Sequence, residues 1–370
     1  MILKELKLTN FRNYGSASVE WSDGINMIRG DNAQGKTNLL EAIAFLSTFS
    51  SFRKSSAAEL VKKDREFFLI RSVFHALSTE HMMNAAYSPD QRYRVSLDGE
   101  EKRRVNQYIG FLNTVVFSPD DLMLMKGAPD ERRRFLDREI IQTAPSTQMI
   151  FQRYQKTLKQ RNALLKADRS SSTDRILDAY DCQLAECGAL ILIRRKELLE
   201  KLQPLVRLSH RRITDGHEEL VLNYEGGLDD FFKGKHRFEE WREAFYQQLK
   251  TTRKIDVKKG FTSFGPHRDD IRFFINGDDI RHFGSQGQQR TASLALKIGE
   301  LELMKGQRGE YPLLLLDDVL SELDEKRREA LISVINGKVQ TFVTDTGSEK
   351  IFDEAREFRV KDGNIRPLKE

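Results

Sequence analysis

Two patterns of hydrophobic residues follow one another along the chain and divide it into three parts. In the first part, apolar runs such as residues 25–29 and 112–117 have the length of strands. From about residue 119 to residue 250 the apolar residues recur at helical spacing instead, and strand-like runs return after residue 261. The pattern predicts an α/β domain interrupted by a mostly helical insertion, with domain bounds at residues 1–118, 119–260 and 261–370.

The helical part predicts two long antiparallel helices. Tyr154, Leu158 and Leu165 share one helical face ahead of the polar stretch Ser-Ser-Ser-Thr at residues 170–173. A second apolar stripe runs from residue 176 to residue 205. A polar break between two long helices is typical of a helical hairpin. We expect both stripes to pack in the core, and the hairpin is too short for a long coiled-coil arm.

The last part of the chain predicts strands and helices in alternation. The turns Asn276-Gly277, between residues 271–275 and 280–283, and Asp362-Gly363 indicate two hairpins. Continuous aliphatic runs indicate buried strands at residues 312–316 and 339–343. Helices are expected at residues 288–305 and 325–335.

One glycine-rich stretch lies between a predicted strand and a predicted helix. Residues 30–37 have the sequence Gly-Asp-Asn-Ala-Gln-Gly-Lys-Thr, which fits the phosphate-binding loop pattern. The backbone amides of such a loop and the start of its helix face the phosphates. Lys36 would reach the β- and γ-phosphates, and the Thr37 hydroxyl would ligate Mg²⁺. A purely structural glycine turn is the alternative, and the flanking strand and helix disfavour it.

Two carboxylates follow the aliphatic run that ends at residue 316. Ligands bind at the carboxyl ends of strands in an open α/β sheet, and Asp317 and Asp318 stand at such an end. Asp317 would hold the hydration shell of Mg²⁺, and Asp318 would orient or deprotonate an attacking water. A solvated strand end or a helix cap is the alternative.

A second turn with anion-binding character is Gly-Ser-Gln-Gly at residues 284–287, which opens onto a predicted helix. It offers backbone amides, a hydroxyl and the positive end of a helix dipole. The chain thus has two anion-binding helix starts. One nucleotide cannot easily use both of them if they lie far apart in one subunit.

The composition indicates the net charge of the protein and its cellular compartment. The 370 residues are 39% hydrophobic and 32% charged, with a net charge of +5 and a pI of about 9.0, which favours a polyanionic partner. The spacing of Cys182 and Cys187 suits neither a metal site nor a disulfide framework, so we expect buried free thiols in a reducing compartment. The N-terminus is charged too early for a secretory signal, and no apolar run could cross a membrane. The expected location is the cytoplasm. The basic residues that could meet phosphates, or equally form solvated helix faces, are Arg132, Arg133, Arg134, Arg194, Arg195, Arg211 and Arg212.

Together these stretches resemble ATPase heads of the ATP-binding-cassette type and, among them, the RecF family of recombination mediators. The resemblance covers essentially the whole chain, and its most specific parts are Gly-Pro-His-Arg-Asp-Asp and Gly-Ser-x-Gly-Gln-Gln-Arg. The matching stretches lie at residues 10–14 (Asn-Phe-Arg-Asn-Tyr), 30–37, 115–121 (Val-Val-Phe-Ser-Pro-Asp-Asp), 264–270 (Phe-Gly-Pro-His-Arg-Asp-Asp), 284–290 and 316–324 (Leu-Asp-Asp-Val-Leu-Ser-Glu-Leu-Asp).

The resemblance implies an ABC-type P-loop ATPase head with an inserted mostly helical domain. It implies that residues 284–287 are the signature motif, which binds the γ-phosphate of ATP held by a second subunit, and that residues 321–324 line the dimer seam. Catalysis would rest on Lys36, Asp317 and Asp318, and Mg²⁺ on Thr37 and Asp317. The residues expected to bind ATP are Arg12, Asn13, Gly30, Asp31, Asn32, Ala33, Gln34, Gly35, Lys36, Thr37, Asn38, Ser285, Gly287 and Gln288.

Three positions depart from transporter-type heads. Ser118 stands where a glutamine senses Mg²⁺, Asp345 stands where a histidine senses the γ-phosphate, and Asp318 stands where a glutamate base is usual. A shorter carboxylate lies farther from the water, so we expect a slow, DNA-stimulated ATPase that acts as a switch. Tyr14 is expected to be a structural aromatic, and His267 is either structural or functional.

The function implied by the resemblance is recombinational DNA repair. The protein would dimerise on ATP and bind gapped DNA or junctions of single- and double-stranded DNA. It would promote RecA loading with RecO and RecR, and serve replication restart and the SOS response. One alternative is a solitary P-loop phosphotransferase acting on a small molecule. Another is a head of the structural-maintenance or Rad50 type, which needs a far longer coiled coil.

Overall fold

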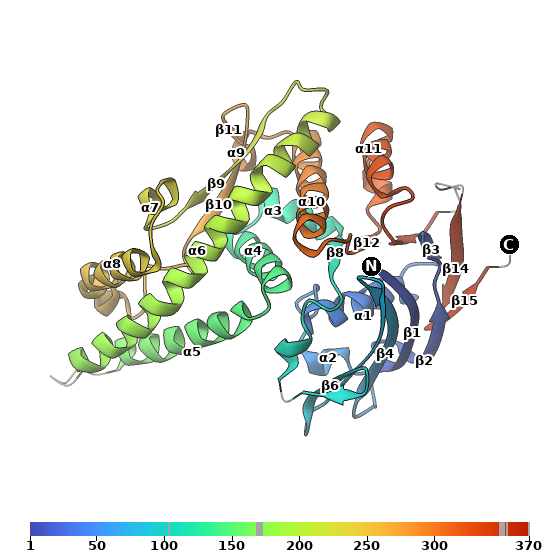
Figure 1. Ribbon diagram of the computed structural model, residues 1–370, viewed down its shortest axis with the longest axis horizontal. Coiled ribbons are helices and arrows are strands. Elements are labelled where there is room, and N and C mark those ends of the chain that lie inside the picture. Colours follow the sequence, from blue (N-terminus) through green and yellow to red (C-terminus); the bar gives the residue numbers. More distant parts are fainter. Residues whose placement is uncertain (103, 168–172, 348–351, 353, 369–370) are drawn as a thin grey trace. The chain divides into compact units, whose positions relative to one another are not determined.

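The computed structural model describes all residues except 103, 168–172, 348–351, 353 and 369–370 (Figure 1). The chain folds into two compact units. We call them the head unit (Met1–Leu122, Leu205–Glu218 and Gln286–Glu370) and the helical unit (Met123–Pro204 and Glu219–Ser285). This division differs from the expected bounds because residues 205–218 belong to the head and residues 261–285 to the helical unit.

The centre of the head is a six-stranded sheet in the order β15-β14-β3-β13-β12-β8. The strands β14, β3, β13, β12 and β8 run parallel, and β15 is antiparallel to its neighbour. The buried strands expected from the aliphatic runs are confirmed, and Leu313 to Leu316 are at most 1% exposed. The strand bounds are β3 Ile25–Arg29, β8 Thr114–Phe117, β12 Leu313–Asp317, β13 Thr341–Asp345, β14 Ala355–Lys361 and β15 Asn364–Pro367.

A second, antiparallel sheet has the order β2-β1-β4-β5-β6-β7. The second strand of the chain begins at Tyr14 and pairs along most of β1. The bounds are β1 Ile2–Phe11, β2 Tyr14–Glu20, β4 Phe68–Ala76, β5 Thr79–Ser88, β6 Arg92–Leu97 and β7 Glu100–Glu101.

The helix α1, Lys36–Thr48, contacts both sheets of the head. Phe45 packs edge-to-face on Phe68, which in turn packs on Phe11, with ring centroids 5.5 and 5.3 Å apart. Most of α1 is therefore buried, and aromatic pairs of this geometry add to the burial. A helix held on both sides gives the loop before it a rigid base.

The remaining helices of the head follow the sequence closely. The helices expected at residues 288–305 and 325–335 are α10, Gln286–Arg308, and α11, Glu325–Ile335. A short α2, Ala57–Leu60, and 3-10 turns at Val105–Tyr108, Pro119–Asp121 and Leu320–Glu322 complete the head. None of the described helices is long and apolar enough to cross a membrane.

The expected antiparallel pair is α5 (Thr147–Lys166) and α6 (Thr173–Ile213). Both lie in the helical unit except for residues 205–213 of α6, which belong to the head unit. Two ion pairs show that the helices run antiparallel. Arg161 of α5 pairs with Asp181 of α6, whereas Arg153, which comes earlier in α5, pairs with Glu186, which comes later in α6. The serine-rich turn expected at residues 170–173 lies largely outside the described residues. The other helices are α3 Leu122–Lys126, α4 Pro129–Thr143, α7 Asp229–Lys233, α8 Phe238–Lys259 and α9 Ile280–Phe283.

A three-stranded sheet of the order β11-β10-β9 completes this unit, with β9 Leu220–Glu225, β10 Asp270–Ile275 and β11 Asp278–Asp279. The turn at Asn276-Gly277 is confirmed, but the expected strand at residues 280–283 is wrong, because these residues form α9. The reason is the Asp279 side chain, which accepts the Arg281 N–H and caps a helix there. Both cysteines are free, but the expectation of two buried thiols is wrong for Cys182, which is exposed.

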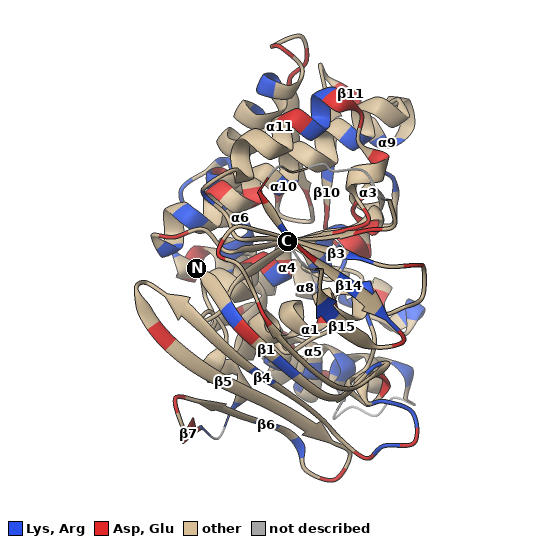
Figure 2. Ribbon diagram, turned by 90° about the vertical axis from the view of Figure 1, so that its right-hand side faces the viewer, with Lys and Arg blue, Asp and Glu red and all other residues tan. Residues whose placement is uncertain are grey.

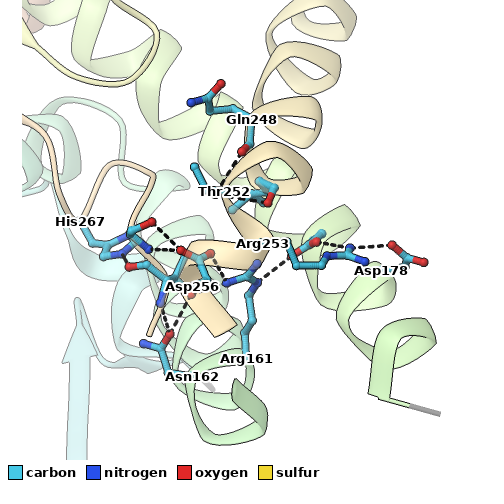
Figure 3. A network of polar contacts seen from close by, with 12 residues as sticks. Arg161, Asn162, Asp178, Gln248, Thr252, Arg253, Asp256 and His267 are labelled. Carbon is cyan, nitrogen blue, oxygen red and sulfur yellow. Dashed lines mark hydrogen bonds and ion pairs between the residues drawn. The ribbon is translucent and has the colours of Figure 1, made fainter. Parts of the chain in front are cut away.

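A buried polar network binds the helices of this unit together (Figure 3). The Arg161 guanidinium is fully buried and donates to Asp181 Oδ1 at 2.7 Å, Asp256 Oδ2 at 2.8 Å and Thr262 Oγ1 at 2.8 Å. It thereby joins α5 to α6, to α8 and to the segment that leads into β10.

His267 belongs to the same region and is held on both sides of its ring. Its Nδ1 accepts a hydrogen bond from the Tyr154 hydroxyl at 2.8 Å, and its Nε2 donates to the Thr262 carbonyl at 3.1 Å. Burial lowers the pKa of His267 to about 4, so the ring is neutral near pH 7. The sequence left open whether His267 is structural or functional, and these contacts favour a structural role.

Replacing His267 with glutamine should change the pH dependence of stability. The unfolded ring takes up a proton near its ordinary pKa of 6.5 and the folded ring only near 4. Its contribution is present above the unfolded value and is lost as the pH falls. The advantage of the wild type over the variant in free energy of unfolding should shrink by up to about 3 kcal/mol between about pH 7 and about pH 4, measured by urea unfolding. Burial raises the pKa of nearby Asp269 to about 6, but both proteins share that titration. A difference that stays constant with pH would contradict this account.

Candidate functional site

The glycine-rich loop lies where the sequence places it, between β3 and α1 of the head. Gly35 has a φ of 116°, and a Cβ there would lie 2.5 Å from the side chain of Asn13. Glycine is therefore required by both conformation and space. Lys36 is only 4% exposed, and its ammonium donates to the carbonyls of Gly30 at 2.8 Å and Asp31 at 3.2 Å. A buried cation is thus held at the loop by backbone oxygens.

The segment after β1 supports this loop from outside. The Asn13 amide donates to the Gln34 carbonyl at 2.8 Å and accepts from the Asn38 amide at 2.9 Å. The fully buried Tyr14 donates its hydroxyl to the Gly35 carbonyl at 3.0 Å, as a structural aromatic would. Arg12 instead forms two 2.7 Å bonds to the buried carboxylate of Glu41 in α1. A direct contact of Arg12 or Asn13 with a nucleotide stays a prediction.

The hairpin of β14 and β15 also reaches the loop. The Asp362 N–H donates to Gln34 Oε1 at 2.6 Å, and the Gly363 N–H donates to the Gln34 carbonyl at 3.3 Å. Asp31, Asn32 and Ala33 at the tip of the loop are exposed. The loop is therefore fixed at its base and open at its tip.

The two carboxylates after β12 meet this loop at the carboxyl edge of the parallel strands. The Thr37 hydroxyl donates to Asp317 Oδ1 at 2.8 Å, although the two residues are 280 positions apart. Burial raises the pKa of Asp317, and the hydrogen bonds from Thr37 and Thr344 oppose that shift. Asp318 has a φ of 51°, a conformation that non-glycine residues adopt rarely.

Thr344 is a site residue that sequence reasoning missed. Its hydroxyl lies 3.0 Å from Asp317 Oδ1 and 3.4 Å from Asp318 Oδ1, and it accepts the Asp318 N–H at 2.9 Å. It is the last residue but one of β13, which pairs with β12 in parallel. The signal in the sequence was its place near the end of a buried strand, because the neighbouring strand carries the two carboxylates.

The three departures from transporter-type heads stand at the ends of strands of this sheet. Ser118 follows β8, and its N–H donates to Asp121 Oδ2 at 2.7 Å as a turn cap. Asp345 ends β13, and one of its carboxylate oxygens lies 3.8 Å from the Arg29 guanidinium. Asp345 thus has a structural partner in this conformation.

The second turn expected to bind an anion lies at the start of α10, a helix of 23 residues. Its Gly284 and Ser285 close the helical unit, and Gly287 and Gln288 lie in the first turn of α10 in the head. The Gln288 amide donates to Glu218 Oε1 at 2.8 Å. The helix start therefore has the dipole and glycines of an anion site, while Gln288 has a partner within its own subunit.

Several of the basic residues considered for phosphate contact are occupied inside the helical unit. Arg132 and Arg195 are each only 2% exposed and pair with Asp270 and Asp137. Arg133 donates to the Asp269 carbonyl. The sequence left phosphate contact and a solvated helix face open for these residues, and Arg132 and Arg195 fit neither, because both are buried against carboxylates.

The fold and the residues at the carboxyl ends of its parallel strands define the class of protein. A parallel sheet with a glycine-rich loop after β3 and paired carboxylates after β12, joined to a helix that begins at Gly-Ser-x-Gly, is the α/β ATPase head of the ATP-binding-cassette type, here with an inserted, largely helical unit. The RecF/RecN/SMC N-terminal domain family matches residues 2–362.

Within this class, the chain belongs to the RecF family. It is 41% identical to the DNA replication and repair protein RecF of Bacillus cytotoxicus over 369 residues, which cover 99% of this chain and 98% of the relative. The RecF of Bacillus cereus is likewise 41% identical over 371 residues, with the same coverage.

Solved structures agree with this assignment. A structure of the recombination mediator protein RecF-ATPrS in the RecFOR pathway has a TM-score of 0.92 at 37% identity, and covers 99% of this chain and 98% of its own. A structure of RecF-ATP has a TM-score of 0.90 at 36% identity, covering 100% and 98%. An SMC head bound to the C-winged helix domain of ScpA has a TM-score of 0.56 at 16% identity, covering 100% and 97%, and shows the shared fold alone.

Proposed function

We propose that the protein binds Mg²⁺ and ATP at residues 30–38 and Asp317, and that ATP joins two copies of the chain in a dimer that acts on DNA. The observation that carries the proposal is the 2.8 Å contact between Thr37 and Asp317. It joins the helix start of the phosphate loop to the carboxylate at the end of β12, as Mg²⁺ binding in P-loop ATPases requires. The RecF-ATP structures, at 36% and 37% identity over nearly the whole chain, support it.

The donor groups fit Mg²⁺ and a triphosphate. A threonine hydroxyl and a carboxylate are hard oxygen ligands, and Mg²⁺ is usually bound through one or two carboxylates together with phosphates and waters. In the described part of the chain, no group of three or more His, Cys, Asp or Glu side chains could hold a metal by itself. We therefore assign direct ligation to Thr37 and the hydration shell to Asp317. The loop amides and Lys36 would hold the phosphates.

Bound Mg²⁺-ATP would supply a phosphoanhydride that water can cleave, with the cation neutralising charge on the phosphates. In this proposal Lys36 exchanges its backbone carbonyls for phosphate oxygens. Asp318 accepts the proton of the attacking water or orients that water. The Thr344 hydroxyl accepts the backbone N–H of Asp318 and so fixes the position of that residue. An aspartate reaches less far than the usual glutamate, so hydrolysis should be slow and serve as a timed switch.

The signature motif gives the reason for a dimer. One ATP held by residues 30–38 would meet Ser285 and Gly287 of a second copy, and the arrangement repeats by symmetry in a closed, head-to-tail pair. The γ-phosphate, which ADP lacks, would bridge the seam, so its loss releases the dimer.

The proposal that DNA is the partner rests on the family and on the overall basic charge. The net charge of +5 favours a polyanion. Figure 2 shows basic and acidic segments intermixed along β1 and α11. By family we further propose gapped duplex or strand junctions as the substrate, RecR and RecO as partners, RecA loading as the outcome in repair, replication restart and the SOS response, and the cytoplasm as the location.

Sedimentation velocity tests the proposal directly. The protein is run with ATP, with ADP and without nucleotide, each with and without gapped duplex. We expect a dimer only with ATP, and a heavier complex when gapped duplex is added. A monomer under all conditions, with phosphate transfer that is independent of protein concentration, would contradict the proposal and favour a solitary phosphotransferase.

A further inference from the structure

The first turn of α11 carries an arginine that reaches the start of the signature helix. Arg327 donates from Nε to the Thr291 hydroxyl at 2.8 Å and from Nη2 to the Gly287 carbonyl at 2.9 Å. The Thr291 hydroxyl in turn donates to the same Gly287 carbonyl at 2.9 Å. Three groups thus close a ring of hydrogen bonds around the first turn of α10.

The remaining arm of the same guanidinium bonds the carboxylate of Asp324. Asp324 is also the N-cap of α11, since it accepts the Arg327 N–H at 3.0 Å. It ends the segment of residues 321–324, which follows Asp318, and Ser321 bonds the Asp318 carbonyl at 3.0 Å. All of these residues belong to the head unit. One side chain therefore spans from the segment after the paired carboxylates to the glycine of the signature motif.

We propose that Arg327 is a positioning residue that holds the signature turn and the segment of residues 321–324 in one fixed arrangement, so that both meet a second copy of the chain together. The inference rests on the proposed ATP-dependent dimer, because residues 284–287 and 321–324 are its two expected seam segments. Arg327 itself touches neither the phosphate loop nor the paired carboxylates in any contact of the described structure. Its effect should therefore fall on dimer formation and leave the binding of ATP by one subunit unchanged.

The geometry of the contacts requires arginine. A planar guanidinium donates in three fixed directions, and here each direction has its own acceptor. A lysine ammonium keeps the charge but cannot reach all three acceptors in one plane. The Arg327 side chain is 18% exposed and Thr291 is 4% exposed, so solvent screens the contacts with Thr291 and Gly287 less than it screens a surface pair. Asp324 is 56% exposed, so its contact with Arg327 is screened more.

The matched control lies one residue away on the same helix. Lys326 pairs with Asp215 at 2.5 Å, and the two side chains are 56% and 66% exposed. Lys326→Met removes the same charge from α11 without touching α10. Arg327→Met and Arg327→Lys form the test set.

Two measurements on these variants separate positioning from simple loss of structure. Sedimentation gives the dimer dissociation constant with ATP, and titration of dilute protein with a fluorescent ATP analogue gives the affinity of one subunit. For Arg327→Met we expect a dimer weakened by about tenfold to hundredfold and a subunit affinity changed by less than about twofold. Arg327→Lys should lie between this variant and the wild type, and Lys326→Met should match the wild type. A dimer of unchanged strength in Arg327→Met, or equal losses in both measurements, would overturn the inference.

Hydrogen exchange of the subunit without nucleotide tests the same arrangement independently of the dimer. Peptides that cover residues 284–292 should exchange faster in Arg327→Met than in the wild type, and Lys326→Met should leave them unchanged. If the wild type itself forms no dimer with ATP, the proposed function fails, and this measurement still decides the inference. Equal exchange in all three proteins would overturn it.

Discussion

A protein carrying Ser285→Arg should bind ATP as a single subunit and form no dimer with it. Ser285 is exposed and directly precedes α10, at the turn that would meet the γ-phosphate held by a second copy. A long cationic side chain there would fill the space of the phosphate and keep the helix start away from it. The loop at residues 30–37 and its contact with Asp317 lie in other segments, so the affinity of the single subunit for ATP should be retained.

Sedimentation with ATP measures this effect, and Thr251→Arg serves as the control. Thr251 is an exposed polar residue of α8, and its hydroxyl bonds only the Gln247 carbonyl of its own helix among the contacts described. We expect the dimer of Ser285→Arg to be weakened at least about 100-fold, which corresponds to about 3 kcal/mol, and that of Thr251→Arg to be unchanged. A normal ATP-dependent dimer of Ser285→Arg would show that the signature turn does not lie at the seam.

Replacing Arg161 with methionine should lower the free energy of unfolding by about 3–5 kcal/mol, because removal of one partner leaves the buried charge of Asp256 uncompensated. Arg161, Asp181 and Asp256 are all fully buried. Without the guanidinium, Asp181 keeps its ion pair with Arg253, whereas Asp256 keeps only its hydrogen bonds from Ser263 and loses its counter-charge.

Urea unfolding of Arg153→Met provides the comparison for this stability effect. Arg153 also joins α5 to α6, through Glu186 at 3.1 Å, but the two side chains are 54% and 46% exposed. Exposed pairs contribute little, so this variant should lose less than about 1 kcal/mol. Similar losses in both variants would mean that burial of the Arg161 network does not govern the stability of the helical unit.

The phosphate loop, the buried strands of the head and the long helices could be predicted because each rests on residues close together in sequence. Glycines at residues 30 and 35 specify a tight turn, and a run of leucines at residues 313–316 specifies a strand buried on both faces. The position of α9 was missed although its signal was local. Asp279 was a possible cap, but the turn at Asn276-Gly277 favoured a second strand.

Pairings between distant segments could not be predicted in this way. The strand β9 was missed because its partner β10 lies about fifty residues later, and its six residues carry a weak signal of their own. Residues 205–218 could not be placed in the head, because contacts with segments far away in the chain reveal it, such as those of Asp215 with Lys326 and of Glu218 with Gln288. The roles of Thr344 and His267 likewise depend on partners far away in the chain.

The glycine-rich loop, the two carboxylates after an aliphatic strand and the Gly-Ser-x-Gly turn were thus determined by the sequence alone, since backbone conformation and hydrophobic periodicity act over a few residues. Only the tertiary structure decided which groups meet. It placed Thr37 on Asp317, Thr344 behind Asp318 and Arg327 between Asp324 and Gly287. Such contacts follow from the packing of strands and helices, because hydrogen bonds form between groups that the fold brings within about 3 Å, however far apart they stand in the chain.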